Sequence, residues 1–389
     1  MAAASDSTSA EGAEMDGPLT SLRVVEFSGI GPGPLVGQLL ADLGADVVTV
    51  DRRSAKAEPA DVNRRNKRSV ALNLRKAEGL AAARQLLNGA DVLIEGFRPG
   101  VMERLGLGPD VCLGANPRLV YGRITGWGQT GPLAHTAGHD INYLGLTGAL
   151  HAIGRPDEPP VPPLNLVADF GGGSMFLVFG ILAALFERSK SGLGQVVDAA
   201  MVDGVPAMMG LLHGMLARGM WSEQRGHNLL DGGAPFYRTY QTADDKFISV
   251  GAIEPEFFAE LVRRAGLPAG EIAIQNDPKH WPDMHARYAQ VFRQRKRDEW
   301  AALLEGSDAC AGPVLSFTEA AEHPHNTARG TFLRQDGVLQ AAPAPRFGRT
   351  PAGRPRPPSA PGADTRAVLA ESGATNEELE RWSAAGALT

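Results

Sequence analysis

Cysteine is scarce in this 389-residue sequence, and only Cys112 and Cys310 are present. Two thiols are too few for a disulfide framework or a zinc cluster, so we expect a protein of a reducing compartment, with the cytoplasm as its location. The net charge of −6 argues against nucleic acid as the main partner. We find no uninterrupted apolar run that could span a bilayer, and we therefore expect no membrane segment. The segment 1–14 is small, polar and acidic, and we expect a disordered tail there rather than a targeting signal.

Helix and strand patterns alternate through the first third of the chain. Strand patterns occupy 22–27, 45–51, 91–97 and 119–126, and helical patterns occupy 35–45 and 79–90. This alternation predicts a parallel, doubly wound sheet of the α/β class. From about residue 226 short strands and polar turns indicate a second, smaller domain, and a Pro- and Arg-rich segment at 342–362 precedes a last helix at 376–388.

A glycine-rich turn, 29–34, follows the first predicted strand, and Asp51 ends the next one. This order superficially indicates a dinucleotide site. Pro32 and Pro34 each remove a backbone N–H where a pyrophosphate would need donors. A tight turn that packs the first helix on the sheet explains the glycines equally well, and we favour it over a nicotinamide site.

Basic residues gather after several predicted strands. Arg52 and Arg98 each follow a strand directly, and ligands of open parallel sheets bind beyond the carboxyl ends of the strands. Guanidinium groups match phosphate geometry, so a ligand such as coenzyme A could use them, with a solvated basic face as the alternative. The set comprises Arg52, Arg53, the segment 63–68, Arg75, Arg98 and Arg104.

His139 and Asp169 are candidates for proton transfer. His139 lies in the string GHDINY, and Asp169 precedes three glycines and a long apolar helix. We expect Asp169 at a helix N-terminus beside free backbone N–H groups. A structural His and a plain N-cap Asp remain open as alternatives. The methionines after residue 174 either fill a core or line a surface that accepts apolar chains.

With these strings, and with RVVEFSGIGPGP and DVLIEGFRPGVMERLGLGP, the sequence resembles the alpha-methylacyl-CoA racemases of the family III CoA-transferase superfamily. The resemblance implies a racemase that interconverts (R)- and (S)-2-methylacyl-CoA through an enolate, without a metal or redox cofactor because coenzyme A is part of the substrate. It also implies a Rossmann-like large domain built from both chain ends, a smaller α+β domain and an interlocked homodimer. Relatives lack the residues before Met15, and we hypothesise that Met15 is the true start.

The expected domain boundaries follow from the resemblance and from the change to short strands and polar turns near residue 226. It comprises the tail at 1–14, the large domain at 15–200, a linker helix at 201–225, the small domain at 226–329, and a return segment with the C-terminal helix of the large domain at 330–389.

The same resemblance assigns site residues. It implies that His139 and Asp169 are the catalytic bases and that Glu254 of the smaller domain assists His139. With this mechanism, the glycine N–H groups after Asp169 are the expected donors to the enolate oxygen. Arg75 stands where relatives usually have Lys. Implied contacts with the coenzyme A substrate are Ile30, Arg52, Leu72, Asn73, Leu74, Arg75, Gly96, Phe97, Arg98, Arg104, Gly138, Asp140, Ile141, Asn142 and Tyr143.

Two other functions remain open. CoA-transferases of this superfamily resemble the chain around Asp169, where the carboxylate forms an acyl anhydride, but they generally lack a His in the position of His139. A non-enzymatic acyl-CoA binding protein is the third reading, and the pairing of His139 with Asp169 speaks against it.

Overall fold

The computed structural model describes residues 17–52 and 58–388, so the predicted tail, Met15 and Arg53 lie outside the described residues. The chain divides into two compact units. The first takes the residues up to Tyr143, Leu166–Val205 and the residues from Phe332 onward, and the second takes Leu144–Asn165 and Pro206–Thr331. The segment 144–165, expected in the large domain, therefore groups with the second unit.

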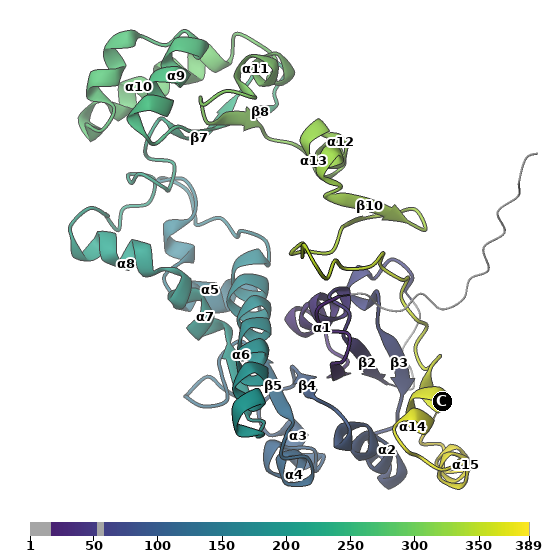
Figure 1. The fold of residues 1–389 in the computed structure, drawn as a ribbon. Helices are drawn as coiled ribbons and strands as arrows, with labels where there is room; N and C mark the ends of the chain where they lie inside the picture. The colour runs from purple at the N-terminus through teal and green to yellow at the C-terminus, as the bar shows by residue number, and fades with distance from the viewer. Residues whose placement is uncertain (1–16, 53–57, 389) are drawn as a thin grey trace, which may run out of the picture. The chain divides into compact units, whose positions relative to one another are not determined.

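A six-stranded parallel sheet runs through the first unit (Figure 1). Its order is β3-β2-β1-β4-β5-β6, the classical doubly wound order, which confirms the predicted α/β class. The order reverses between β1 and β4, and this topological switch point is where such folds bind ligands. The strands are β1 (Arg23–Phe27), β2 (Asp46–Asp51), β3 (Arg68–Ala71), β4 (Val92–Glu95), β5 (Val120–Thr125) and β6 (Val196–Ala200). Strand β3 was not predicted, because it begins at the last residue of a basic run and its four residues carry little apolar signal.

Helices accompany the strands of the first unit. They are α1 (Pro32–Asp42), the 3-10 turn η1 (Val62–Arg64), α2 (Ala77–Asn88), α3 (Val101–Arg104), α4 (Pro109–Ala115), α5 (Asp140–Leu146, which crosses into the second unit), the π-helical turn η3 (Leu166–Met175), α6 (Phe176–Ser191), α7 (Met201–Met208, also shared), α14 (Thr365–Glu371) and α15 (Asn376–Ala384). A hairpin of β10 (Phe332–Gln335) and β11 (Val338–Ala341) also belongs to this unit.

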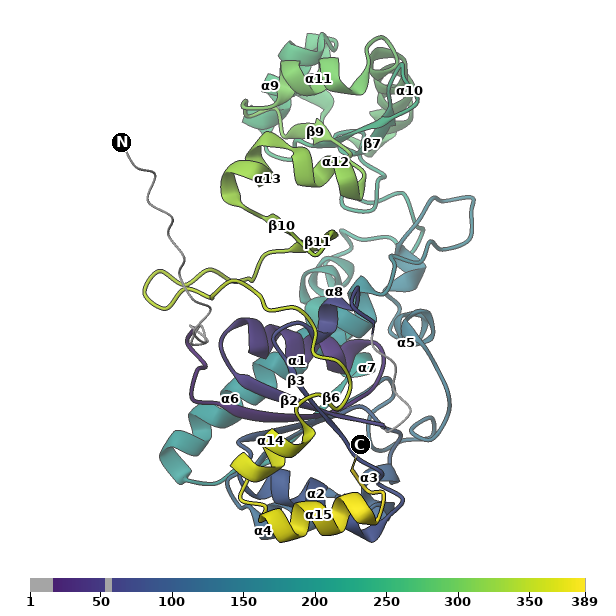
Figure 2. The same ribbon diagram turned by 90° about the vertical axis from the view of Figure 1, so that its right-hand side faces the viewer.

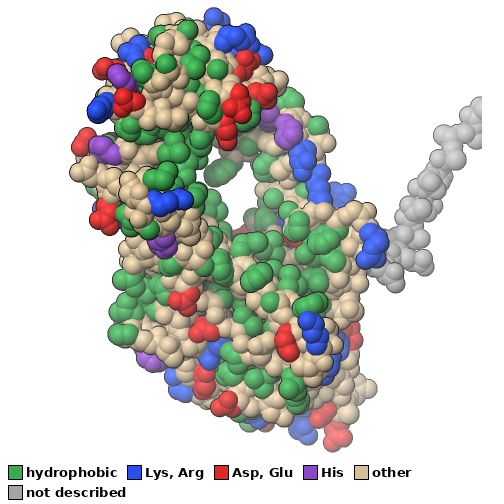
Figure 3. Space-filling model, turned by 60° about the vertical axis from the view of Figure 1, so that its left-hand side comes forward, with side chains coloured by type: hydrophobic (Ala, Val, Ile, Leu, Met, Phe, Trp, Pro, Cys, Tyr) green, Lys and Arg blue, Asp and Glu red, His purple; other side chains and the backbone are tan. Residues whose placement is uncertain are grey.

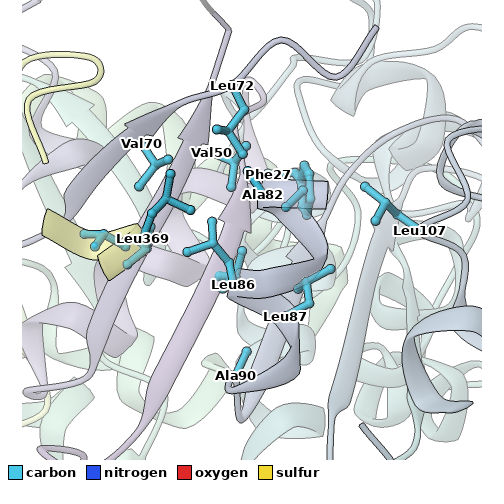
Figure 4. Close-up of a cluster of buried hydrophobic side chains, with 14 of the residues drawn as sticks. Phe27, Val50, Val70, Leu72, Ala82, Leu86, Leu87, Ala90, Leu107 and Leu369 are labelled. Carbon is cyan, nitrogen blue, oxygen red and sulfur yellow. The ribbon is translucent and has the colours of Figure 1, made fainter. Parts of the chain in front are cut away.

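The chain ends complete the hydrophobic core of the first unit. Leu86 and Leu87 of α2 meet Leu369 of α14 in a buried cluster that the sheet also lines (Figure 4). Trp382 of α15 lies in the same cluster. Helices α14 and α15 run beside α2 (Figure 2). The unit is therefore built from both ends of the chain.

The second unit is an α+β arrangement. Its antiparallel sheet consists of β7 (Tyr237–Gln241), β8 (Phe247–Gly251) and β9 (Ala311–Pro313). Its helices are α8 (Gly210–Ala217), α9 (Pro255–Ala265), α10 (Trp281–Phe292), α11 (Arg297–Leu304), α12 (Phe317–Glu322) and α13 (Pro324–Arg329), with 3-10 turns η2 (Leu150–Ala152), η4 (Ala269–Ile274) and η5 (Pro278–His280). Aromatic side chains such as Phe236, Phe258 and Tyr288 fill its core. The expected linker helix at 201–225 is two helices, α7 and α8, because the chain makes a tighter turn at Met209.

The expectation that no apolar run is long enough to span a bilayer differs from what the helices show. The turn η3 and helix α6 form a continuous helical stretch, Leu166–Ser191, of 26 residues with a mean hydropathy of 1.8, which by length and composition could cross a membrane. Only 33% of its most apolar window is buried. The core helix of a soluble protein passes the same test, so the finding by itself requires no bilayer.

Candidate active site at the carboxyl edge of the parallel sheet

The loops that follow the parallel strands carry most of the predicted substrate contacts. Ile30 follows β1 with 88% of its surface exposed, and Gly96–Arg98 follow β4, the neighbouring strand. These two loops flank the switch point of the sheet. Arg52 follows β2 and the segment 72–75 follows β3, so the same edge continues outward on one side.

Three of the predicted contact residues have side chains committed to packing. Leu72 is buried in the core of the first unit, and Leu74 and Phe97 pack against that core. Asn73 donates its backbone N–H to the Ala387 carbonyl at 2.9 Å, which ties the loop to the C-terminal segment. This loop can therefore present its backbone and Arg75, but not Leu72, to a ligand.

The basic segment 63–68 has a structural role that the sequence did not reveal. Four of its cations are bound to carboxylates of the sheet and of α1, at N–O distances of 2.5 to 2.6 Å: Arg64–Asp51, Arg65–Asp42, Lys67–Glu26 and Arg68–Asp46. Both members of the Lys67–Glu26 pair are almost fully buried, and burial raises the pKa of Glu26 although Lys67 opposes this shift. Neither phosphate binding nor a solvated basic face describes this segment.

The other predicted arginines remain available. Within residues 17–52 and 58–388, no carboxylate lies within 4.0 Å of the guanidinium groups of the following four exposed residues: Arg52, Arg75, Arg98 and Arg104. Gly100 leaves room for the last of these, since a Cβ atom there would lie 3.1 Å from Arg104 Nη1. Cations without internal partners at the ligand edge of a sheet are suited to phosphate.

His139 is held at the start of α5 by its own helix. Its backbone N–H donates to Asn142 Oδ1 at 3.0 Å, and its carbonyl accepts the Asn142 N–H at 2.8 Å. The imidazole is exposed and has no hydrogen-bond partner among the described residues. It is therefore free to meet a substrate.

Tyr143 fixes the backbone that precedes His139. Its ring packs edge-on against Trp127 with centroids 4.7 Å apart, and its hydroxyl donates to the Gly138 carbonyl. A Cβ atom would lie 2.0 Å from this ring at Gly126 and 2.6 Å at Gly138, so neither position leaves room for a side chain unless the ring moves. Close packing of this kind transmits small changes in shape to the site.

Asp169 belongs to the same neighbourhood. The pKa of Tyr143 is raised first by burial and then by the negative charge of Asp169, whereas the positive charge of Arg98 lowers it. All three groups are thus close enough to interact electrostatically.

Asp140 links the two candidate bases. Its Oδ2 accepts the backbone N–H of Ala168 at 3.0 Å and that of Asp169 at 2.8 Å. The residue that follows His139 in the sequence therefore binds the backbone of Asp169. Asp140 is 7% exposed, and its Oδ1 has no partner among the described residues.

Asp169 lies in the first turn of a helical stretch, as expected, but it is not the residue that caps this stretch. The helical stretch begins at Leu166, so Asp169 lies within the π-helical turn η3, and Asp140 occupies the capping role. The glycine N–H groups after Asp169 bond within that turn, because each π-helical N–H bonds to the carbonyl five residues earlier. Within the part of the chain that the structure describes, the N–H groups of Asp140 and Ile141 have no acceptor.

The glycine-rich turn lies against Asp169. Gly31 has a φ of 76°, and a Cβ atom there would lie 3.6 Å from Asp169 Oδ2. The buried hydroxyl of Ser174 donates to the Pro32 carbonyl at 2.8 Å, and Lys67 Nζ donates to the Pro34 carbonyl at 2.8 Å. These contacts support the tight-turn interpretation. Sequence reasoning missed Ser174, although it directly follows the three glycines.

Two further predictions concern other places in the chain. Glu254 is exposed at the N-cap of α9 in the second unit, and its predicted assistance to His139 of the first unit stays a prediction. The methionines divide between both interpretations: Met201 and Met215 are buried, whereas Met175, Met208 and Met220 are exposed.

Known proteins resemble this chain over nearly its whole length. The model of CoA-transferase family III matches residues 19–365. The chain is 47% identical to the alpha-methylacyl-CoA racemase of Mus musculus and 45% identical to that of Homo sapiens, in each case over 93% of this chain and 95% of the relative. A crystal structure of a CaiB/BaiF family protein from Brucella suis has a TM-score of 0.78 at 28% identity and covers 92% of this chain and 100% of that one. The chain belongs to CoA-transferase family III.

Proposed function

We propose that this protein is an acyl-CoA racemase that interconverts (R)- and (S)-2-methylacyl-CoA thioesters by 1,1-proton transfer. The observation that carries the proposal is the bond from the Asp169 backbone to Asp140, the neighbour of His139, because it ties the two candidate bases to one frame. The identity of 45% and 47% to two proteins named as racemases supports it.

The proposed reaction needs two bases. A proton alpha to a thioester is weakly acidic, so its removal at neutral pH requires a positioned base and stabilisation of the enolate oxygen. Inversion requires that His139 or Asp169 removes the proton from one face while the other residue, already protonated, returns a proton to the opposite face. The carbon–hydrogen bond that breaks and the one that forms share the same carbon, so no electrons are exchanged with a cofactor.

The backbone N–H groups of Asp140 and Ile141 are the proposed donors to the enolate oxygen. They adjoin His139 and are free of described acceptors, whereas the glycine N–H groups first expected in this role are used inside η3. Fixed N–H donors that need no reorganisation are effective at stabilising a developing oxyanion.

Coenzyme A is proposed to lie along the carboxyl edge of the sheet. Its phosphates would meet Arg52, Arg75, Arg98 and Arg104, and the acyl group would reach His139 and Asp169. The proposed reaction uses no metal, redox cofactor, nucleic acid or membrane. We also propose the cytoplasm as the location of the protein.

The proposal includes a homodimer with interlocked subunits. Helix α6 supports self-association, because large apolar side chains on it are exposed, among them Phe179 and Phe186. Figure 3 shows that hydrophobic side chains reach the surface in many places on the face in view. In this proposal Glu254 of one subunit assists His139 of the other.

The decisive experiment incubates a 2-methylacyl-CoA of single configuration with the protein in deuterium oxide. Proton NMR should show deuterium entering the alpha position, and chiral analysis of the hydrolysed acid should show loss of configuration. His139→Ala should lose exchange with the stereoisomer that His139 deprotonates, by roughly a hundredfold or more, because a positioned base contributes about that factor. His135→Ala is the matched control, since His135 is an exposed histidine in the same segment.

Two outcomes would overturn the proposal. Undiminished racemisation by His139→Ala would remove His139 from the mechanism. Transfer of coenzyme A to an added carboxylic acid, without deuterium uptake and with a hydroxylamine-sensitive acyl group on Asp169, would favour a CoA-transferase.

A further inference from the structure

A single buried arginine holds both ends of the segment that carries two of the free cations. Arg123 of β5 donates from Nε to Glu95 Oε1 at 2.7 Å, and Glu95 ends β4. From the other side of its guanidinium, Nη1 donates to Glu103 Oε1 at 2.8 Å, and Glu103 lies in α3. Strands β4 and β5 and helix α3 come together in this part of the first unit (Figure 1).

The contacts continue into the ligand loop itself. Glu95 Oε2 accepts the backbone N–H of Phe97 at 2.8 Å, so the same carboxylate that binds Arg123 also bends the loop that begins at Gly96. Arg98 follows directly on this loop, and Arg104 is the residue after Glu103. One guanidinium thus fixes the chain on both sides of Arg98 and immediately before Arg104.

The contact between Arg123 and Glu95 is buried, whereas the contact with Glu103 reaches the surface. Arg123 is 6% exposed and Glu95 only 1%, whereas the Glu103 side chain is 43% exposed. A buried charge left without a partner is costly, so Arg123 and Glu95 hold each other firmly. Tyr121, on the same face of β5, donates its hydroxyl to the Leu107 carbonyl at 2.9 Å and braces the chain after α3. The planar fork of arginine can serve two carboxylates at once, which an ammonium group does less well.

We propose that Arg123 is a positioning residue that sets the shape of the segment 95–104 and so aims Arg98 and Arg104 at the phosphates of the substrate's coenzyme A moiety. Arg123 itself meets no substrate, because its guanidinium is buried between Glu95 and Glu103. The inference rests on the proposed coenzyme A site and goes beyond it by naming the group that organises it.

The test compares two substrates that carry the same acyl-pantetheine part and differ in whether the phosphate-bearing nucleotide part of coenzyme A is present. Steady-state rates are measured for a 2-methylacyl-CoA and for the matching 2-methylacyl-pantetheine thioester, which lacks the 3′-phosphorylated adenosine and the pyrophosphate. Two variants are compared. Arg123→Lys keeps the positive charge but loses the planar guanidinium that binds both carboxylates. Glu103→Gln removes the charge of the partly exposed partner and leaves the pair of Arg123 with Glu95 in place.

We expect both variants to raise KM for the acyl-CoA roughly tenfold while kcat at saturation stays near that of the wild type, because a contact made equally in the ground and transition states changes binding alone. For the pantetheine thioester both parameters should stay unchanged. The double variant should raise KM for the acyl-CoA no more than Arg123→Lys alone, since the two residues act through one contact.

A matched control separates positioning from stability. Arg188→Lys changes an arginine that is also mostly buried and that binds Asp91 Oδ1 at 2.9 Å, but Asp91 precedes β4 at the opposite edge of the sheet. This variant should leave KM for both thioesters unchanged. Equal losses of Arg123→Lys on both substrates, or an unchanged KM on both, would overturn the inference.

Calorimetric titration with coenzyme A distinguishes failure of the inference from failure of the proposed function. A wild-type protein that binds coenzyme A but racemises nothing would disprove the racemase, while weaker binding by Arg123→Lys and Glu103→Gln would still support positioning. Affinity for coenzyme A that is equal in the wild type and both variants would disprove positioning, whatever the reaction.

Discussion

At the scale of single residues, internal pairing decides which charges can meet a ligand. Arg65 and Lys67 are nearly inaccessible and bind carboxylates, whereas Arg52 and Arg98 are exposed without carboxylate partners. Arg52 follows β2 and Arg98 lies in the loop after β4, whereas Arg65 and Lys67 precede β3. The internal partners of a basic residue therefore decide whether it remains available to a ligand, and a basic run in the sequence does not reveal those partners.

His285 of α10 makes the second unit sensitive to acid. Its Nε2–H donates to the Gly233 carbonyl at 2.7 Å, while Arg238 and Tyr240 face its other ring nitrogen. Burial, and then the positive charge of Arg238, lower its pKa from 6.5 to about 4. The unfolded chain takes up this proton below about pH 6.5 and the folded unit only below about pH 4, so the stabilisation is complete above pH 6.5 and is lost between these values.

The measurement is the midpoint of thermal unfolding at pH 7 and pH 5, for the wild type and for His285→Gln, whose amide can still donate to Gly233. We expect the midpoint of the wild type to fall by several degrees more than that of the variant. Parallel changes in the two proteins would show that His285 does not couple folding to pH.

At the scale of elements, one face of the helical stretch Leu166–Ser191 is apolar and uncovered. Met175, Phe179, Leu182 and Phe186 recur at helical spacing and are 37% to 71% exposed. Residues at this spacing form a single stripe along a helix. The homodimer proposed above would cover this stripe.

Two glutamates in the stripe should prevent self-association. We expect Phe179→Glu combined with Phe186→Glu to convert a dimer into a monomer, because buried aromatic anchors often contribute about 2 kcal/mol or more each to an interface. Sedimentation velocity measures the result. Ser191→Glu adds one negative charge, half that of the double variant, about 140° around the helix from Phe186 and should leave the dimer intact. A wild-type monomer would disprove the dimer, and cosedimentation with lipid vesicles would point to a bilayer instead.

At the scale of the whole molecule, the C-terminal segment closes the first unit. Asp364 Oδ2 accepts the backbone N–H of Ser69 at 2.8 Å, and Thr365 Oγ1 accepts that of Ala71 at 3.1 Å, both on the edge strand β3. Leu388 forms a bridge to Leu72 beyond the end of that strand. A row of backbone groups that would otherwise be unpaired is thereby covered.

The stability of the first unit should depend on this return. Trp382 of α15 is 3% exposed in the shared core, so Trp382→Ala should lower the free energy of unfolding by about 3–5 kcal/mol through lost burial and a cavity. Urea denaturation followed by circular dichroism measures the change. Phe317→Ala, at a residue 84% exposed, should change it by less than about 0.5 kcal/mol. A small effect of Trp382→Ala would mean that the return segment is dispensable.

Local patterns in the sequence were sufficient for the parallel sheet and for most of its strands and helices, because periodicity and turn residues act over a few neighbouring positions. They also indicated the family, since the motifs around His139 and Asp169 are continuous stretches of sequence that can be compared directly with those of relatives. They did not reveal β3 or the short helix α14, because each contains only a few apolar residues. They also did not reveal that the helical stretch begins at Leu166, before Asp169, because the apolar residues there continue without a clear start signal.

Tertiary structure alone decided which basic residues are paired, that Asp140 binds the backbone of Asp169, and that Arg123 joins Glu95 to Glu103. Each of these contacts links residues that lie 20 or more positions apart in the chain, apart from the closer Arg64–Asp51 pair. Such contacts depend on the order in which strands lie side by side, and electrostatic pairing acts on distance in space, which the sequence does not specify.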